Sequence, residues 1–310
     1  MFVQAAIYPS ELPGQDRTFA GYRSRLGRAH DRLPPALLML LAVIAVELAW
    51  ALATVVFSDL GAAGTALLST GFAAVVFTVA SPPRIDERLR RHWLLVLLFG
   101  LADACMSLSF LFALKHEIPL GIATTIAFLG PLGLAVVTSR RAHHFLWIGI
   151  ALLGIALLTP AIGDHLSVVG LCFAAMSALA WAAFVPLTKL SARAFGGSDG
   201  LTFSLWVSTL ILVPFALAEG SLFQANFFSI AGCLVVALLG TVVPTAVEFR
   251  VLQRISALTY GILVTLEPAV GALVGAALLG QEIGPQMWIA VGCVTVAAMG
   301  ITISDSKRKS

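Results

Sequence analysis

The chain has 310 residues, of which 59% are hydrophobic and 11% charged, and its mean hydropathy is +0.97. This composition is typical of a protein with many membrane spans, each of which needs about 20 mostly apolar residues. The net charge of +3 follows from basic loops next to these spans, so it does not indicate a nucleic-acid partner.

Residues 1–35 form a tail that mixes Arg, Gly, Pro and acidic residues without the apolar core of a signal peptide, so we expect a flexible cytoplasmic segment. Ten continuous apolar stretches follow, and because they do not alternate they predict helices rather than barrel strands. The first five stretches are 36–57, 60–80, 93–114, 118–138 and 145–162. The second five are 168–188, 200–218, 228–249, 259–280 and 286–304, followed by a short tail, 305–310.

The basic residues orient these spans. All of the 19 Lys and Arg residues except Lys115 fall in the tails or in the loops on one side of the predicted membrane. The loops on the other side are short and carry Asp59, Glu117, Asp164, Glu219 and Glu282. Because Lys and Arg concentrate in cytoplasmic loops, both termini are predicted to be cytoplasmic. The sequence therefore predicts an all-α, multi-pass protein of the cell (inner or plasma) membrane, with the lipid bilayer as its surroundings.

The two sets of five spans, residues 36–162 and 168–304, carry a weak internal repeat. Gly130-Pro131 in the fourth span aligns with Glu267-Pro268 in the ninth, and Trp147 and Trp288 open the fifth and tenth spans. Since five crossings are an odd number, the second set enters the membrane from the opposite face. Inverted repeats of this kind favour alternating access, with substrate held near the midplane between the two repeats.

Prolines in the spans indicate where helices are interrupted, since proline removes an intrahelical hydrogen bond and frees a carbonyl group. We expect Pro131 with its neighbour Gly130, Pro268, and Pro244 in the eighth span to act as helix breaks or gating positions. The alternative for each proline is a plain kink, which packing against neighbouring helices tolerates.

Four acidic residues lie within the spans: Glu267 and Glu47 near the middle, Asp103 in the third span, and Glu248 toward one end of the eighth. A charge inside the bilayer costs at least about 2.5–3.5 kcal/mol, so such residues usually face a cavity and serve a pathway. No Lys or Arg lies deep in a span to neutralise them, and carboxylates in such surroundings suit the uptake and release of a proton. Proton coupling is therefore our mechanistic hypothesis, although a surface salt bridge with Arg250 is an alternative for Glu248.

Trp50, Trp181 and Trp206 lie away from the span ends, where a ring can stack on a substrate or anchor the helix at the membrane interface. Trp181 is surrounded by small residues, so we expect it to face the substrate pathway. For Trp50 and Trp206 we expect packing or anchoring.

The segments that carry a family resemblance lie in the fourth and ninth spans. They are Ile118-Pro119-Leu120-Gly121-Ile122-Ala123, Phe128-Leu129-Gly130-Pro131, Leu266-Glu267-Pro268-Ala269 and Leu279-Gly280-Gln281-Glu282. With these segments the chain resembles the drug/metabolite transporter superfamily, specifically EamA-type members similar to threonine/homoserine exporters. The resemblance implies a ten-helix fold of inverted repeats around a central cavity and the export of small amino acids.

Other functions are less consistent with the sequence. It lacks the motifs of hydrolases and metalloproteases, and it has no Gly-Lys pair for a phosphate-binding loop, so we expect no enzyme activity, cofactor or metal. The expected partners are a small-molecule substrate and protons. Two alternatives remain open: a channel, and an exporter of cationic or amphipathic metabolites or drugs.

Overall fold

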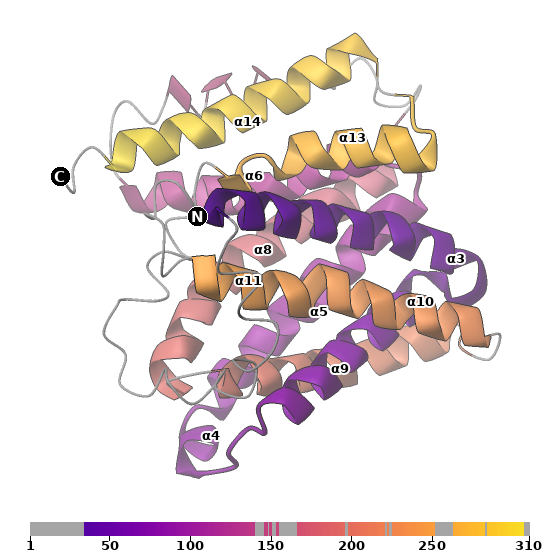
Figure 1. Cartoon of the computed structure of the whole chain (residues 1–310), viewed down its shortest axis with the longest axis vertical. Coiled ribbons are helices and arrows are strands. Elements are labelled where there is room, and N and C mark those ends of the chain that lie inside the picture. The colour runs from indigo at the N-terminus through magenta and orange to yellow at the C-terminus, as the bar shows by residue number, and fades with distance from the viewer. Residues whose placement is uncertain are drawn as a thin grey trace.

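The computed structural model of the chain describes residues 34–139, 146–147, 149–150, 153–154, 166–195, 198–220, 222, 225–251, 263–282 and 284–306. The elements of these residues are helices, which pack side by side (Figure 1). In the first half of the chain they are α3 Pro35–Ala80, α4 Glu87–Arg91, α5 Trp93–Lys115 and α6 Leu120–Ser139. The second half contains α8 Val168–Phe195, α9 Asp199–Glu219, α10 Phe227–Ala237, the π-helix η4 Leu238–Val242, α11 Val243–Val251, α13 Glu267–Leu279 and α14 Pro285–Ser306.

Six helical segments within the described residues are long and apolar enough to cross a membrane. They are Pro35–Phe57, Asp59–Ala80, Trp93–Lys115, Val168–Phe195, Asp199–Glu219 and Phe227–Glu248. These segments match the first, second, third, sixth, seventh and eighth predicted spans, and shorter apolar helices fall within the fourth, ninth and tenth. The predicted all-helical membrane protein is thus confirmed, whereas most of the fifth predicted span, the start of the ninth and most of both tails lie outside the described residues.

Helix α3 contains two predicted spans joined by a kink at Gly61, which has a positive φ of 64°. The backbone amides that follow the kink are capped by the carboxylate of Glu219, which accepts hydrogen bonds from Ala62 N (3.3 Å) and Ala63 N (2.7 Å). Glu219 also forms an ion pair with Lys115 at the end of α5. This junction therefore fixes the second span of the chain against the third and the seventh.

Replacing Gly61 with alanine is expected to destabilise the protein by about 1–3 kcal/mol, because a non-glycine residue is strained at this φ. The new Cβ would also overlap the carboxylate of Glu219. Thermal unfolding of the detergent-solubilised protein measures the effect. Gly64→Ala is the matched control, since a Cβ there meets Leu60 and Leu222 at ordinary distances of 3.4–3.8 Å. Equal melting temperatures of the two variants would contradict this prediction.

The eighth span is irregular where it approaches Pro244. Its middle turn is the π-helix η4, in which the amide of Val243 donates to the carbonyl of Leu238, five residues earlier. Proline cannot donate a backbone hydrogen bond, and a π-helical turn is a common way for a helix to absorb such a break. Gly240 lies in this turn close to the Cβ of Ala49 on α3, so the irregular turn also brings the two helices together.

Among the described residues, most of the contacts between helices connect the first half of the chain with the second. Helix α5 packs on α8, the two segments of α3 pack on α9 and on the α10–η4–α11 helix, and α6 packs on α8 and α13. Glycines allow the closest approaches: a Cβ at Gly121 would overlap the backbone of Ala272, and one at Gly130 would overlap the carbonyl of Ala178. The core therefore lies between the halves rather than within each of them.

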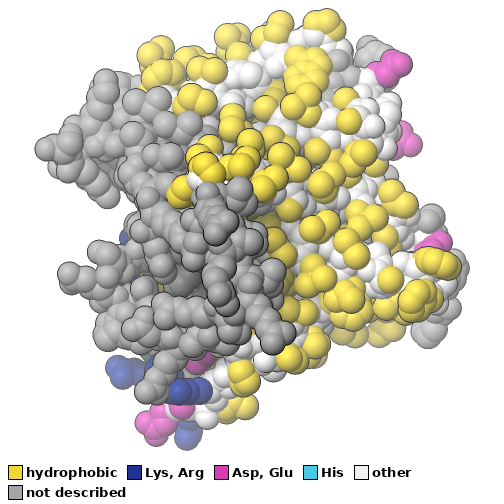
Figure 2. All heavy atoms as spheres, in the orientation of Figure 1, with side chains coloured by type: hydrophobic (Ala, Val, Ile, Leu, Met, Phe, Trp, Pro, Cys, Tyr) yellow, Lys and Arg dark blue, Asp and Glu magenta, His cyan; other side chains and the backbone are white. Residues whose placement is uncertain are grey.

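The surface is apolar over the flanks of the bundle (Figure 2). We call the end that carries α4 the basic end, because Arg84, Arg88, Arg90 and Arg91 lie there. The opposite end, which carries Asp59, Glu117, Glu219 and Glu282, is the acidic end. In the face shown in Figure 2, dark blue spheres lie at the basic end, as expected for a protein oriented by its Lys and Arg residues.

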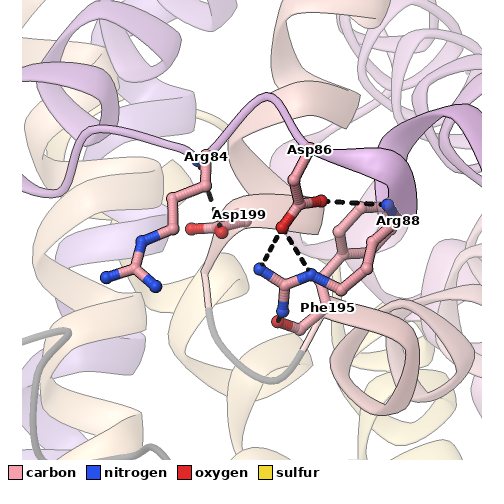
Figure 3. Close-up of polar contacts among 5 residues, drawn as sticks. All are labelled: Arg84, Asp86, Arg88, Phe195 and Asp199. Atoms are coloured by element: carbon pink, nitrogen blue, oxygen red, sulfur yellow. Dashed lines mark hydrogen bonds and ion pairs between the residues drawn. The ribbon is translucent and has the colours of Figure 1, made fainter.

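A cluster of polar contacts joins the two halves of the chain at the basic end (Figure 3). Asp86 caps α4 by accepting from Arg88 N, and its other oxygen accepts from Arg88 Nε at 2.7 Å. Arg88 in turn donates to the carbonyl of Phe195 at 2.8 Å, while the amide of Arg84 donates to Asp199 at 3.5 Å. The hydrogen bond from the Arg88 guanidinium lowers the pKa of the Asp86 carboxyl, so the contact persists at neutral pH.

Candidate functional site

A cavity of about 270 Å³ lies in the middle of the bundle, between the two halves of the chain. Its walls come from α3, α5, α6, α8, α9, α10, η4, α11, α13 and the segment that leads into α13. Polar side chains are spread over several of these walls, and the remaining lining is aliphatic and aromatic. A small apolar pocket with a few converging polar groups is the usual form of a small-molecule site.

All the residues predicted to form the substrate or proton pathway line this cavity. They are Glu47, Asp103, Trp181, Glu248 and Glu267, and Pro244 lines it as well. These residues come from α3, α5, α8, α11 and α13, so the fold brings together side chains that are more than 200 residues apart in sequence. Gly130, Pro131 and Pro268 are not part of the lining.

Glu47 is the most deeply buried of the acidic residues, with 1% of its surface exposed. Its Oε2 accepts a hydrogen bond from the hydroxyl of Thr124 on α6 at 3.3 Å. Gly271 on α13 lies next to the same oxygen, because a Cβ built there would be 2.7 Å from Oε2. Glu47 is thus enclosed by three helices from both halves of the chain, and it interacts electrostatically with Glu267.

Glu267 is the first residue of α13, and the two residues before it, Thr265 and Leu266, form a turn between this helix and the helical residues 263–264. The ninth span is therefore interrupted beside Glu267. Pro268 occupies the second helical position, where its missing N–H costs no intrahelical hydrogen bond. A carboxylate in the first turn is also favoured by the helix dipole. In contrast, α6 continues across Pro131 as a regular helix, so the two aligned prolines have different helical contexts.

Asp103 and Glu248 extend the polar surface away from Glu47. Asp103 lies on α5 one turn before Ser107, whose hydroxyl donates to the Asp103 carbonyl at 2.7 Å. Glu248 interacts electrostatically with Glu267. The lining residues Thr245 and Thr241 lie three and seven positions before Glu248. The cavity therefore has a row of polar groups along the eighth span.

Aromatic rings form another part of the wall. Trp181 packs edge-on against Phe128, with 5.8 Å between ring centroids. Trp50 packs against Phe110 with 4.6 Å between ring centroids, as expected, and it also lines the cavity, which the sequence interpretation did not predict. Its position three residues after Glu47 on the same helix face is the signal that could have revealed this. Trp206 is not part of the lining, and its ring nitrogen donates to Thr78.

The lining also contains serines and threonines that were not predicted as site residues from the sequence. They are Ser69, Thr70, Thr124, Ser177, Thr188, Thr241 and Thr245. The pair Thr241 and Thr245, at i and i+4, could have been recognised because it shares a helix face with Glu248. The other hydroxyl residues carry no such signal, since serine and threonine in spans also commonly bond to their own helix.

The lining contains four carboxylates and, among the described residues, neither Lys, Arg nor His. An ammonium group of a substrate would find acidic partners here, and the hydroxyl groups can donate to a substrate carboxylate. The tryptophan rings add surfaces that attract a cation. The cavity is thus suited chemically to a small amino compound.

The cavity extends through the middle of the bundle toward both ends. Toward the basic end it reaches Leu201 in the first turn of α9 and Thr188 on α8. Toward the acidic end it reaches Leu111 near the end of α5 and Thr124 near the start of α6. Beyond them the helix ends are joined by Glu219, as described above, and by Gln281, whose side-chain oxygen accepts from Leu120 N at 2.9 Å.

Residues 168–303 match the model of the EamA-like transporter family. This match, together with the relatives below, confirms the resemblance to that family that was inferred from the sequence. The chain is therefore a multi-pass membrane transporter.

Its relatives include two bacterial proteins named threonine/homoserine exporter RhtA. The one from Escherichia coli (strain K12) is 28% identical over 276 residues, which cover 88% of this chain and 93% of the relative. The one from Salmonella typhimurium (strain LT2) is 28% identical over 272 residues, which cover 87% and 92%. The chain is also similar to a solved structure titled only as the crystal structure of a protein, with a TM-score of 0.54 and 17% identity over 88% of this chain and 99% of the other. This last similarity shows the shared fold alone.

Proposed function

We propose that the protein exports small amino acids of the threonine/homoserine type from the cytoplasm across the cell (inner) membrane, in exchange for protons and by alternating access. The observation that carries this proposal is the convergence of Glu47, Asp103, Trp181, Glu248 and Glu267 on one cavity between the two halves of the chain. The names of the RhtA relatives support amino acids as the substrate class.

The pattern of helix contacts supports an inverted repeat. An inverted repeat of five spans relates the first span to the sixth and the third to the eighth. It therefore requires that a contact between the third and sixth spans be matched by one between the eighth and the first. Both contacts occur, as α5 with α8 and as the α10–η4–α11 helix with the first segment of α3, where Gly240 lies close to Ala49. The repeat also relates the second span to the seventh and the fourth to the ninth, so a contact within either pair is mapped onto itself. Both of these contacts occur.

Alternating access requires that the cavity open to one side of the membrane at a time. With the basic end in the cytoplasm, Glu219 and Gln281 join helix ends on the outer side, and the contacts of Arg84 and Arg88 join the two halves on the cytoplasmic side. The cavity lies between these two sets of contacts, so we expect each set to open in turn during the transport cycle. The direction of export follows if the outer contacts open when substrate and proton exchange.

Proton coupling is supported by the acidic lining. Carboxylates crowded into an apolar site cannot all be ionised at low cost, so a bound proton or a substrate cation must relieve their repulsion. Competition between the two for the same carboxylates links the movement of one to the movement of the other. No ATP-binding motif occurs in the sequence, so a gradient is the expected energy source.

Efflux from cells that express the protein tests the proposal. Cells loaded with labelled amino acids should release threonine or homoserine faster than cells without the protein, and the release should saturate with internal concentration. An unchanged release of every amino acid in the panel would contradict the proposed substrate class.

A second candidate function is the export of cationic metabolites. It is favoured by the four carboxylates in a lining whose described residues include no Lys, Arg or His. The cavity volume of about 270 Å³ argues against large amphipathic drugs, because pockets for drug-sized ligands usually measure roughly 300–1,000 Å³. Including small amines and diamines in the efflux panel separates this function from amino-acid export.

A further inference from the structure

The surroundings of Glu47 indicate how this carboxylate is held. Thr124 on α6 has one hydroxyl proton and two acceptors within reach: Oε2 of Glu47 at 3.3 Å and the carbonyl of Leu120 at 2.9 Å. When Glu47 is ionised, the hydroxyl can donate to it. When Glu47 is protonated, it can donate to the Thr124 oxygen while Thr124 donates to Leu120. The same hydroxyl therefore fits both charge states of the carboxyl group.

Gly271 provides the space for this arrangement. It lies one turn after Glu267 on α13, and a Cβ there would be 2.7 Å from Glu47 Oε2 and 3.1 Å from the Thr124 hydroxyl. Any side chain at this position would displace the carboxylate or break its hydrogen bond. The absence of a side chain thus allows Glu47 of the first half of the chain to approach the helix that carries Glu267.

The two carboxylates both line the cavity, and Glu47 lies against Gly271, one turn after Glu267 on the same helix. The other acidic residues of the lining are Glu248 on α11 and Asp103 on α5. The described part of the lining contributes no basic side chain. Two like charges in such surroundings titrate as a pair, and a single positive charge relieves their repulsion.

We propose that Thr124 and Gly271 are positioning residues that hold Glu47 beside Glu267, so that the two carboxylates form one site for a single positive charge. A proton occupies the site in one half of the transport cycle, and the ammonium group of the substrate occupies it in the other. This inference rests on the proposed function, because it specifies where the exported amino compound and the proton compete. It assigns one shared site rather than separate sites for the substrate and the proton.

Thr125 provides a matched control for Thr124. Both side chains are buried, and both donate to the carbonyl four residues earlier, but only Thr124 contacts Glu47. Thr124→Val should raise the substrate concentration for half-maximal efflux about tenfold or more and shift the pH profile of transport. Thr124→Ser should restore the half-maximal concentration and the pH profile, and Thr125→Val should behave as the unmodified protein.

For Gly271→Ala we expect the same defect as for Thr124→Val. Gly292→Ala is the control, since a Cβ at Gly292 meets no heavy atom within 4 Å.

Infrared spectroscopy of the full-length protein in lipid provides a readout that does not need a known substrate. The carbonyl stretch of protonated Glu47, identified by its loss in Glu47→Gln, should shift in Thr124→Val and remain in place in Thr125→Val. An unshifted band in Thr124→Val, or the absence of such a band at any pH, would overturn the inference. If the band shifts while no amino acid is exported, the shared site stands and the proposed substrate class fails. Normal export and an unchanged pH profile in Thr124→Val would mean that the proposed function stands and the inference of a shared site fails.

Discussion

Replacing Glu267 with glutamine is expected to reduce amino-acid export at least tenfold while leaving the amount of protein in the membrane unchanged. Glutamine keeps the size of the side chain but removes the negative charge at the point where α13 begins beside the cavity. A hydrogen bond to a charged group contributes about 1.5–3 kcal/mol, which corresponds to roughly 10–100-fold in binding. The loss of a proton acceptor from the pair with Glu47 should also flatten the dependence of export on pH.

The measurement compares initial rates of threonine efflux from cells that contain equal amounts of the two proteins. Glu282→Gln is the matched control, because Glu282 is exposed in the loop after α13 and does not line the cavity. Glu282→Gln removes one negative charge, as Glu267→Gln does, but from a part of the chain outside the cavity. Equal efflux rates for Glu267→Gln and the unmodified protein would show that Glu267 has no part in transport.

Replacing Gly130 with alanine is expected to destabilise the protein more than adding one methyl group at any other position on α6. A Cβ at Gly130 would overlap the carbonyl oxygen of Ala178 on α8, where the two backbones are in direct contact. Backbone atoms cannot rotate away as a side chain can, so the helices must separate. Overpacking usually costs about 1–3 kcal/mol, and we expect a value at or above the upper end of this range.

Gly133 offers a control on the same helix, two residues after Pro131. A Cβ at Gly133 meets no heavy atom within 4 Å, so Gly133→Ala should leave the melting temperature nearly unchanged. Thermal unfolding in detergent and the yield of folded protein compare the two variants. The close packing of α6 on α8 would be refuted if Gly130→Ala melted at the same temperature as Gly133→Ala.

The sequence predicted the helical class, most span positions and all the acidic residues of the cavity because these features follow from local rules. A charged residue in an apolar run, such as Asp103, has few roles other than lining a cavity. The hydroxyl group of Thr124 could not be predicted in this way, because its importance depends on its distance from Glu47, which is 77 positions away in sequence. Long-range contacts of this kind arise from packing between the halves.

The contexts of the prolines show the same limit. Pro268 and Pro131 align in the sequence, yet the helix begins at Glu267 in one case and continues past the proline in the other. The different helical contexts of the two prolines depend on neighbouring helices. Beside Pro131, Gly130 packs directly against the backbone of Ala178 on α8. The roles of Pro131, Pro268, Pro244 and Gly130 in gating remain proposals that follow from the alternating-access mechanism.

The most direct test of the account is counterflow in proteoliposomes that contain the purified protein and a pH-sensitive dye. With unlabelled threonine inside, labelled threonine should enter against its own gradient, and an imposed threonine gradient should move protons in the opposite direction. Saturable counterflow coupled to proton movement is the predicted result. A threonine flux that rises linearly with concentration, shows no counterflow and moves no protons would contradict the proposed exchange and indicate a channel.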